Sequence, residues 1–308
     1  MSERHQSPAG DISVVIATHD ARQWDRLARS VTSVQSQTSL PLETIVVVDH
    51  NESLLARVRS ELSGVMVTPN TRTKGASGAR NAGTALARGG LVAFLDDDAY
   101  ADPWWLARMA EAVRHPAVVG VGGRIAPAWD RTAPSWFPEE FAWVVGGTYR
   151  GLPEAATPVR NVWSGNMVIR RSAFEAVGGF REGFGKVGGR SRPEDTELCI
   201  RVTQETGGVW VYDPSALVHH AVPIERATVS YFLRRCFAEG RGKAALMRLV
   251  GNGEGLRSER NHALRLPRAI WREALGGGPG GLRRGLAIGA GLVAATSGLV
   301  VEGAGRPR

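Results

Sequence analysis

The sequence predicts an α/β fold: a Rossmann-like, mostly parallel central sheet flanked by helices, with an additional C-terminal helical region. Apolar, β-branched runs at residues 12–17, 44–48 and 91–95 indicate strands buried on both faces. Stretches typical of helices lie between and after these runs, at residues 24–37, 52–62, 77–87 and 103–114. Strands that alternate with helices in this way are typical of a parallel sheet with helices on both faces.

Polar residues follow each of the three predicted strands. The first strand ends at Thr18, the second at Asp49, and the third at Asp96, Asp97 and Asp98. Ligands of parallel α/β sheets bind beyond the carboxyl ends of the strands. We therefore expect these side chains to share one crevice.

The three consecutive carboxylates of Asp96, Asp97 and Asp98 indicate a divalent cation. Adjacent carboxylates repel one another and resist burial, yet an apolar strand leads directly into them. Oxygen ligands suit Mg²⁺ and Mn²⁺, which also bridge to phosphate oxygens. The alternative is an acidic loop on a solvated surface. The preceding strand favours a metal that holds a diphosphate.

The small residues of segment 74–83, KGASGARNAG, fit the same crevice. They allow the backbone to approach a ligand, and a helix that starts near Ser77 would offer free N–H groups to an anion. Arg80 is placed to reach a phosphate or to stack on a nucleoside. The segment lacks the ending of a Walker loop and is not G-x-G-x-x-G.

Seven segments, in this order and at these spacings, resemble family 2 glycosyltransferases of the GT-A fold. They are VVIATHD, IVVVDHN, KGASGARNAG, FLDDDA, SGNMVIRR, GGRSRPEDTELCIRV and YDPSALVHH. The resemblance covers roughly residues 11–245. It implies a GT-A type sheet and an inverting enzyme that takes a UDP-, GDP- or dTDP-sugar and a divalent cation, Mn²⁺ or Mg²⁺.

The resemblance also implies which residues bind the donor. Asp49 matches the carboxylate that pairs with the nucleotide base, and Arg80 matches the arginine of the A-R-N-x-G motif near ribose and diphosphate. Thr73 stands where family members often have Asn, which leaves base and sugar specificity open. The donor-binding residues implied are Ala17, Thr18, Asp49, Thr73, Gly75, Arg80, Asp96 and Asp97.

Further matches concern the metal, the base and the acceptor. Asp98 and Asp96 match the D-x-D motif, and His220 matches a histidine that joins the metal. Asp195 matches the general base, with Glu194 as a second candidate. The residues expected on the acceptor side are Trp163, Gly165 and Asn166. A turn residue such as Asn166 is as often only a capping group.

Chemistry alone also favours a base at Asp195. An acceptor hydroxyl has a pKa far above 7, so it needs a general base as it attacks. Asp195 opens an amphipathic run, 195–204, which places it in the first turn of a helix, where the dipole favours a carboxylate. The alternative is an ordinary acidic residue at a helix start after Pro193. One base and one face of attack imply a single displacement, and hence inversion.

Two segments in the second half of the chain have an unusual composition. Residues 127–160 are rich in Pro and Trp, and Trp129, Trp136, Trp143 and Trp163 would either stack on a sugar or an apolar acceptor or simply pack. Residues 178–193 contain six glycines, which predicts a mobile loop over the site that ends at the expected base.

Length and composition predict one large domain with an appendage. The 308 residues divide into a flexible N-terminus (1–10), a GT-A domain (11–225) and a basic helical C-terminal region (226–308). Within the domain, 11–125 form the nucleotide-sugar-binding half and 126–225 the acceptor and catalytic half. Cys199 and Cys236, in helical patterns, argue against a disulfide scaffold and suit a reducing cytoplasm. The polar residues 1–10 show no signal sequence.

Positive charge is concentrated in the C-terminal region. Residues 222–308 hold 15 Lys and Arg against 6 Asp and Glu, and residues 285–301 carry no charge. A basic amphipathic region beside an uncharged helix indicates an anionic membrane surface. The uncharged run is short and rich in Gly and Ala, so we expect it to lie in the interface or to pack on the domain rather than to cross. A solvated helical tail with one buried face is the alternative, and nucleic acid is a weaker one.

These observations together predict a metal-dependent, inverting glycosyltransferase. We expect it in the cytoplasm, peripheral at the inner face of the cell membrane, acting on a glycan, a lipid-linked molecule or a small molecule. A nucleotidyltransferase is the alternative enzyme, but residues 17–20 lack its glycine-rich loop. A sugar-nucleotide-binding or membrane-docking protein without catalysis is the alternative from another class. Intact Asp96, Asp98 and Asp195 argue against it.

Overall fold

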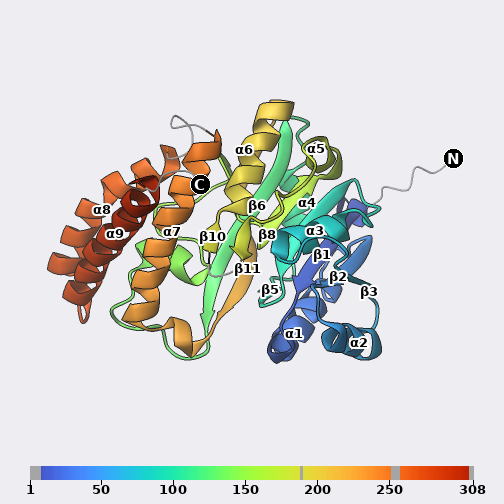
Figure 1. Cartoon of the computed structure of the whole chain (residues 1–308), viewed down its shortest axis with the longest axis horizontal. Helices are drawn as coiled ribbons and strands as arrows, with labels where there is room; N and C mark the ends of the chain where they lie inside the picture. The colour runs from blue at the N-terminus through green and yellow to red at the C-terminus, as the bar shows by residue number, and fades with distance from the viewer. Residues whose placement is uncertain (1–7, 188–189, 251–256, 305–308) are drawn as a thin grey trace. The chain divides into compact units, whose positions relative to one another are not determined.

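The predicted strands and helices of residues 12–114 are all present in the computed structural model, which describes residues 8–187, 190–250 and 257–304 (Figure 1). The strands are β1 (Ile12–Thr18), β2 (Glu43–Val48), β3 (Met66–Pro69) and β4 (Leu91–Asp96). The helices are α1 (Trp24–Gln35), α2 (Glu52–Glu61), α3 (Ala76–Thr84) and α4 (Trp105–Ala112). Of the N-terminus predicted to be flexible, residues 1–7 lie outside the described residues, and Pro8–Asp11 form a 3-10 turn.

The described chain divides into two units by its internal contacts. The first, called here the sheet unit, comprises residues 8–126, 153–185 and 194–220. The second, called the helical unit, comprises the described residues of 127–152, 186–193 and 221–304. Residues 127–152 therefore group with the C-terminal helices, whereas the sequence analysis placed them with the acceptor half.

The sheet unit is built on a mixed sheet with the strand order β3-β2-β1-β4-β8-β6-β11-β5. Strands β3, β2, β1 and β4 are parallel. The parallel arrangement of β1, β2 and β4 was predicted, whereas β3 was not identified from the sequence. β8 (Asn166–Arg170) runs antiparallel to both β4 and β6 (Val118–Trp129). β11 (Val209–Val222) pairs antiparallel with β5 (Ala99–Ala101) and with β7 (Thr157–Val159). The parallel half carries the polar strand ends, and the antiparallel half brings β11 to β5.

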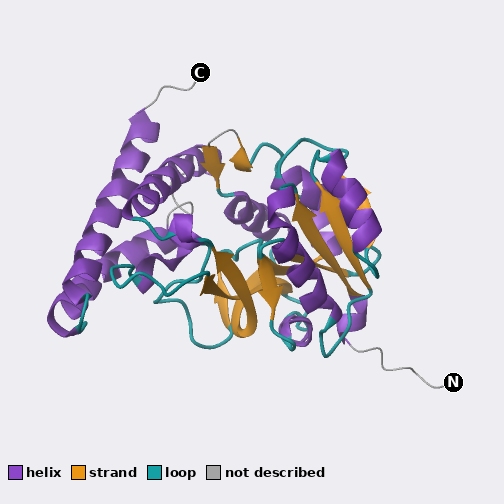
Figure 2. Cartoon of the chain, turned by 90° about the horizontal axis from the view of Figure 1, so that it is seen from below, coloured by secondary structure: helices purple, strands orange, loops and turns teal. Residues whose placement is uncertain are grey.

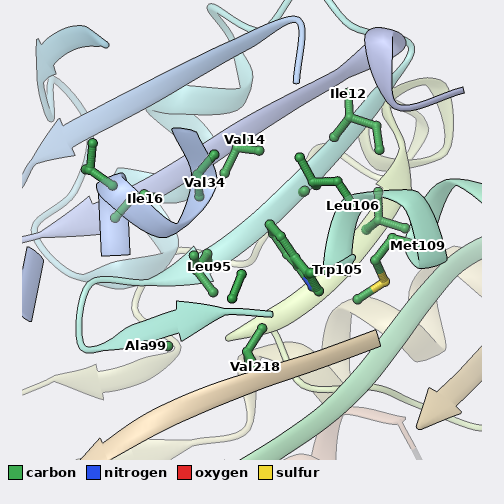
Figure 3. Packing of buried hydrophobic residues seen from close by; sticks show 14 of the residues in the cluster. Ile12, Val14, Ile16, Val34, Leu95, Ala99, Trp105, Leu106, Met109 and Val218 are labelled. Carbon is green, nitrogen blue, oxygen red and sulfur yellow. The ribbon is translucent and has the colours of Figure 1, made fainter. Parts of the chain in front are cut away.

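Alternate side chains of the parallel strands enter two separate hydrophobic clusters. Ile12, Val14 and Ile16 of β1 face a cluster that includes Trp105 and Leu106 of α4 (Figure 3). Val15 of β1 faces the opposite cluster, which contains residues of α3, α5 (Arg171–Ala176) and α6 (Glu194–Thr206). Figure 2 shows helices on both sides of these strands. Burial on both faces explains why the strands are continuous apolar runs.

The glycine-rich segment 178–193 differs from the predicted mobile loop. Asn81 of α3 is buried, and its side chain donates to the carbonyl of Phe180 (2.8 Å) and accepts from the Phe180 N–H (2.9 Å). Ser77 donates to the carbonyl of Phe184. Farther on, β9 (Gly185–Val187) and β10 (Arg190–Arg192) form a two-stranded sheet, and residues 188–189 lie outside the described residues. Hydrogen bonds to α3 thus hold the first part of the segment in place.

The helical unit consists mainly of α7 (Val229–Val250), α8 (Arg257–Gly276) and α9 (Gly281–Ala304). Their cluster includes Phe137, Phe141, Phe232 and Ile288, and Trp129, Trp136 and Trp143 pack against it. These three tryptophans therefore follow the packing interpretation rather than the stacking one. By length and composition, α9 is the one helix among the described residues that is apolar enough to cross a membrane.

Candidate active site

Asp49 lies one residue beyond β2 and is almost fully buried in a ring of donors. Its Oδ1 accepts from Asn70 Nδ2 at 2.6 Å and lies 2.9 Å from His50 Nδ1, and its Oδ2 accepts from the Gly75 N–H at 2.9 Å. Burial alone would raise the pKa of Asp49, but the hydrogen bonds outweigh it and hold the pKa below its usual range. The carboxylate of Asp49 is therefore held in place and ionised just beyond the C-terminal end of β2.

Ala17 and Thr18, at the end of β1, lie beside this carboxylate. The Thr18 carbonyl accepts from the Asp49 N–H at 2.7 Å. The register sets Ala17 between Val47 of β2 and Asp96 of β4. The ends of three neighbouring strands thus lie side by side.

The segment before α3 brings the backbone close to Asp49. Gly75 is the N-cap of the helix and has a φ of +125°, which L side chains rarely adopt. Gly78 lies so close to the Thr73 carbonyl that an added Cβ would be 1.9 Å from that oxygen. The Thr73 N–H donates to Glu182 at 3.2 Å. These glycines are therefore required for the close turn that the sequence indicated.

Arg80, one turn into α3, joins the acidic strand end to the start of α6. Its guanidinium is buried and donates to Asp96 Oδ1 at 2.7 Å, and its other terminal nitrogen lies 3.4 Å from Glu194 Oε1. Burial opposes the charge of Arg80, but the carboxylates of Asp96 and Glu194 raise its pKa above its usual value. Arg80 thus stays charged and holds two carboxylates from distant parts of the sequence.

Asp96, Asp98 and His220 form a cluster with the donor set of a divalent-metal site. Their ligand atoms all lie within 4.8 Å of one another, and His220 Nε2 is 3.2 Å from Asp98 Oδ1. Two carboxylates and one imidazole fit a hard divalent ion that accepts a nitrogen ligand. The cluster combines the end of β4 with β11, which no local sequence pattern links.

Asp97, between the two ligand candidates, has a different environment. Burial, and then the neighbouring charge of Asp98, raise the pKa of Asp97 to about 7. Burial, together with the crowding of carboxylates, therefore makes ionisation of Asp97 costly. A bound cation would offset that cost.

Glu194 and Asp195 occupy the first turn of α6, where the sequence placed them. Burial and the neighbouring Asp195 raise the pKa of Glu194 well above its usual range, although Arg80 opposes the shift. Asp195 Oδ1 accepts from the Thr196 N–H at 2.6 Å. Two carboxylates in unequal environments, near a buried arginine, are typical of acid–base sites.

The three residues predicted for the acceptor side have different surroundings. Asn166 is fully buried: its Oδ1 accepts from Trp105 Nε1 at 2.7 Å, and its Nδ2 donates to the carbonyls of Arg124 and Ala216. Its amide therefore ties β8 to β6, β11 and α4. Gly165 packs on Asp96, since an added Cβ would lie 2.4 Å from Asp96 Oδ2. Trp163 is half-buried against the cluster of Figure 3.

Several residues that support the site were not identified from the sequence. Asn70 holds Asp49, and Ser30 donates from α1 to the Asp96 carbonyl at 3.2 Å. Glu197, buried one turn after Glu194, accepts from Arg181 and Arg201. For Asn70 no signal was available, because β3, the strand that it follows, was not predicted from the sequence. For Ser30 and Glu197, no local pattern distinguishes them from ordinary helical residues.

Comparisons with known proteins identify the family of the chain. The family model described as "Glycosyl transferase family 2" matches residues 13–178. A protein of Haloferax volcanii named glucosyl-dolichyl phosphate glucuronosyltransferase is 33% identical over 240 residues, 76% of this chain and 77% of that protein.

Two solved structures share the fold. The mannosyltransferase PcManGT from Pyrobaculum calidifontis, in complex with GDP-Man and Mn²⁺, matches with a TM-score of 0.58 at 16% identity, over 94% of this chain and 89% of that one. GalNAc-T7 with UDP, GalNAc and Mn²⁺ matches with a TM-score of 0.52 at 19% identity. This match covers 82% of the present chain, which spans only 54% of that longer one.

Proposed function

Because this chain belongs to family 2 of the glycosyltransferases and has their GT-A fold, we propose that it is a divalent-metal-dependent, inverting enzyme. It moves a sugar from a nucleotide-sugar donor to an acceptor hydroxyl. The observation that carries the proposal is the cluster of Asp96, Asp98 and His220, with Arg80 joining Asp96 to the start of α6. Two structural relatives hold a nucleotide or nucleotide sugar together with Mn²⁺.

The donor is proposed to lie across the ends of β1, β2 and β4. Asp49, held ionised, accepts hydrogen bonds from the nucleotide base, and Ala17 and Thr18 line it. The diphosphate lies towards the start of α3, where the helix dipole favours an anion. Thr73, Gly75 and Asp97 border the donor. Buried Arg80 supplies a positive charge beside Asp96.

Asp98, Asp96 and His220 are proposed to hold the metal, Mn²⁺ or Mg²⁺. When bound, such an ion neutralises the charge that develops on the diphosphate leaving group. Mixed oxygen and nitrogen donors suit Mn²⁺ better than Mg²⁺, which prefers oxygen ligands and keeps its water.

Asp195 is proposed as the general base. It takes the proton of the acceptor hydroxyl as that oxygen attacks the anomeric carbon and the bond to the diphosphate breaks. Glu194 keeps its proton more readily than an ordinary glutamate because it is buried beside Asp195. With one base and no covalent intermediate, a single displacement inverts the anomeric carbon.

The acceptor is proposed to be lipid-linked, and the enzyme to work in the cytoplasm at the inner membrane face. The relative from Haloferax volcanii is named for a glucosyl-dolichyl phosphate. One helix, α9, is apolar enough for membrane contact. Trp163 and Gly165 border the proposed acceptor side, and the buried Asn166 supports them from within.

Incubation with UDP-, GDP- and dTDP-sugars tests this proposal. We expect one donor to raise the melting temperature and to release its nucleoside diphosphate slowly, with Mn²⁺ and more weakly with Mg²⁺. Binding without release would favour a non-catalytic binder. No binding of any donor with either ion would contradict the proposal.

A further inference from the structure

Helices α8 and α9 expose large apolar side chains at helical spacing. Leu264, Trp271 and Leu275 on α8, and Leu282, Leu286 and Val293 on α9, are each between 65% and 80% exposed. We call these six residues the α8–α9 apolar face. On α9 they lie along a stripe that reaches Val300 and contains no charge. Large exposed apolar side chains that recur on one face of a helix are typical of a contact site.

Both stripes lie on the same side of the helix pair. The helices are antiparallel: Gly281 of α9 packs on Glu273, and Gly285, one turn later, packs on Ile270 and Ala274. Each residue of a helix is rotated by about 100° from the one before it. On both helices the exposed stripe therefore lies about a quarter turn beyond the residues in contact, in the direction of increasing residue number. Because the helices are antiparallel, equal senses direct both stripes to one side.

Three exposed arginines near this face have no acidic partner among the described residues. Among the described residues of α8 and α9, each glutamate pairs with a basic side chain: Glu259 with Lys243, Glu273 with Arg272 and Arg284, and Glu302 with Arg241 and Arg248. Arg260, Arg268 and Arg283 are exposed, and no ion pair is found for them in the described part of the chain. An apolar surface with unpaired arginines complements anionic lipid headgroups.

The opposite side of α9 packs against other parts of the helical unit. Gly291 packs on Phe141 and Phe232, and Gly298 packs on the α7 backbone at Phe237. Arg284 is bound to Glu273 and to the carbonyl of Ser135. A helix that crossed a bilayer would have to break these contacts and bury charged residues such as Arg284 in lipid.

From these observations we propose that the α8–α9 apolar face docks the enzyme on an anionic bilayer, with α9 lying in the interface plane. The proposal rests on the proposed function only in placing the enzyme at a membrane. Trp271 supports it, because tryptophan is enriched where apolar and aqueous phases meet. The apolar side chains enter the lipid, and the arginines contact the headgroups.

Flotation of the full chain with vesicles tests the docking. We expect binding to phosphatidylcholine vesicles that contain phosphatidylglycerol at low salt, with weaker binding at high salt or without the anionic lipid. Leu286→Asp and Trp271→Ser should each weaken binding about tenfold or more, as expected for losing one buried apolar side chain. Leu40→Asp, an exposed leucine in the sheet unit, should bind like the parent. Unchanged binding of both face variants would overturn the proposal.

Measuring how deeply two positions of α9 enter the bilayer distinguishes a helix that lies in the interface from one that crosses the membrane. In Leu286→Cys and Val300→Cys, labelled with an environment-sensitive dye, the labels lie about 21 Å apart along the helix. Equal shallow depths support the proposal, and graded depths overturn it. Buried Cys199 and Cys236 should stay unlabelled. Light scattering gives the oligomeric state of the parent and of Leu286→Asp. If the parent is a dimer that Leu286→Asp breaks, and the parent does not bind vesicles, the face is a contact between copies and the proposal is overturned. Nucleotide binding of each variant reports separately on the proposed function.

Discussion

His220 meets Asp98 because β11 pairs with β5 in a register that sets His220 opposite Ala99, the residue that follows Asp98. The Nε2 and Oδ1 atoms are then 3.2 Å apart, and Asp96 completes the cluster from the end of β4. The geometry of the proposed metal site therefore depends on the pairing of two antiparallel strands as well as on the D-x-D spacing.

The first prediction is that Asp98→Ala abolishes the divalent-dependent part of nucleotide binding while the fold survives. Removing one carboxylate takes away a ligand and relieves repulsion from Asp97, so stability should not fall greatly. Titration calorimetry of a nucleoside diphosphate with and without Mn²⁺ measures the effect. Glu61→Ala, on the surface of α2, is the control. Equal Mn²⁺-dependent affinity in parent and variant would refute the metal assignment.

The second prediction separates chemistry from binding. Asp195→Asn keeps the shape of the side chain but cannot take a proton, so the transfer rate should fall about 10²-fold or more. Donor affinity should change little. Single-turnover transfer and calorimetry measure the two quantities. Glu194→Gln is the comparison, and a larger loss of rate there than in Asp195→Asn would exchange the roles of the two residues.

A third prediction uses the contact between Gly165 and Asp96. A methyl group at Gly165 would lie 2.4 Å from Asp96 Oδ2, and Arg80 holds the other oxygen. Gly165→Ala should therefore displace the Asp96 carboxylate and weaken Mn²⁺-dependent nucleotide binding several-fold, although no ligand atom is removed. Gly276→Ala, with open space around it, is the control. Full metal-dependent binding by Gly165→Ala would show that Asp96 is not a ligand in this position.

The fourth prediction concerns pH and two glutamates with opposite shifts. The pKa of Glu194 is raised by burial, so its ionisation costs stability as the pH rises above its unfolded value of about 4.3. Glu194→Gln should therefore gain stability relative to the parent as the pH rises from 4 towards neutrality.

Glu182 should behave in the opposite way. A hydrogen bond from Thr73 is the main cause that lowers its pKa. Glu182→Gln should be less stable than the parent above the unfolded-state pKa of about 4.3. This difference in stability should vanish as the pH falls through the folded-state pKa of Glu182. Denaturant unfolding at several pH values measures both variants. The same sign for both variants would contradict the assigned environments.

Three of the four parallel strands and most residues of the candidate site were predictable because their signals are local in sequence. Apolar runs that end at Thr18, Asp49 and Asp96 indicate the carboxyl edge of the sheet. Gly75 and Arg80 lie together in one short segment. The start of α6 was marked by Pro193 and the acidic pair after it. Each of these signals lies within about ten residues of the structure that it predicts.

The rest depends on tertiary pairing, which local patterns do not encode. The apolar run of β8, from Met167 to Ile169, has the same composition whether it runs parallel or antiparallel to β4. Asn166 is a polar turn residue in the sequence, and only the neighbouring strands reveal it as a buried, fully bonded amide. Asn70 holds Asp49 only because β3 pairs with β2.

The last prediction tests how tightly α9 is packed on α7. A methyl group at Gly298 would lie 2.0 Å from the carbonyl oxygen of Phe237, a backbone atom that cannot move without shifting the helix. Gly298→Ala should therefore force the helices apart and cost about 1–3 kcal/mol in the free energy of unfolding. Gly289→Ala is the matched control: it lies on the same helix with nothing near it, and should gain about 0.5–1 kcal/mol from helix propensity. Denaturant unfolding followed by circular dichroism measures both. If Gly298→Ala is as stable as Gly289→Ala, then α9 is not held against α7 by close backbone contact, and it would be free to leave the helical unit and enter a membrane.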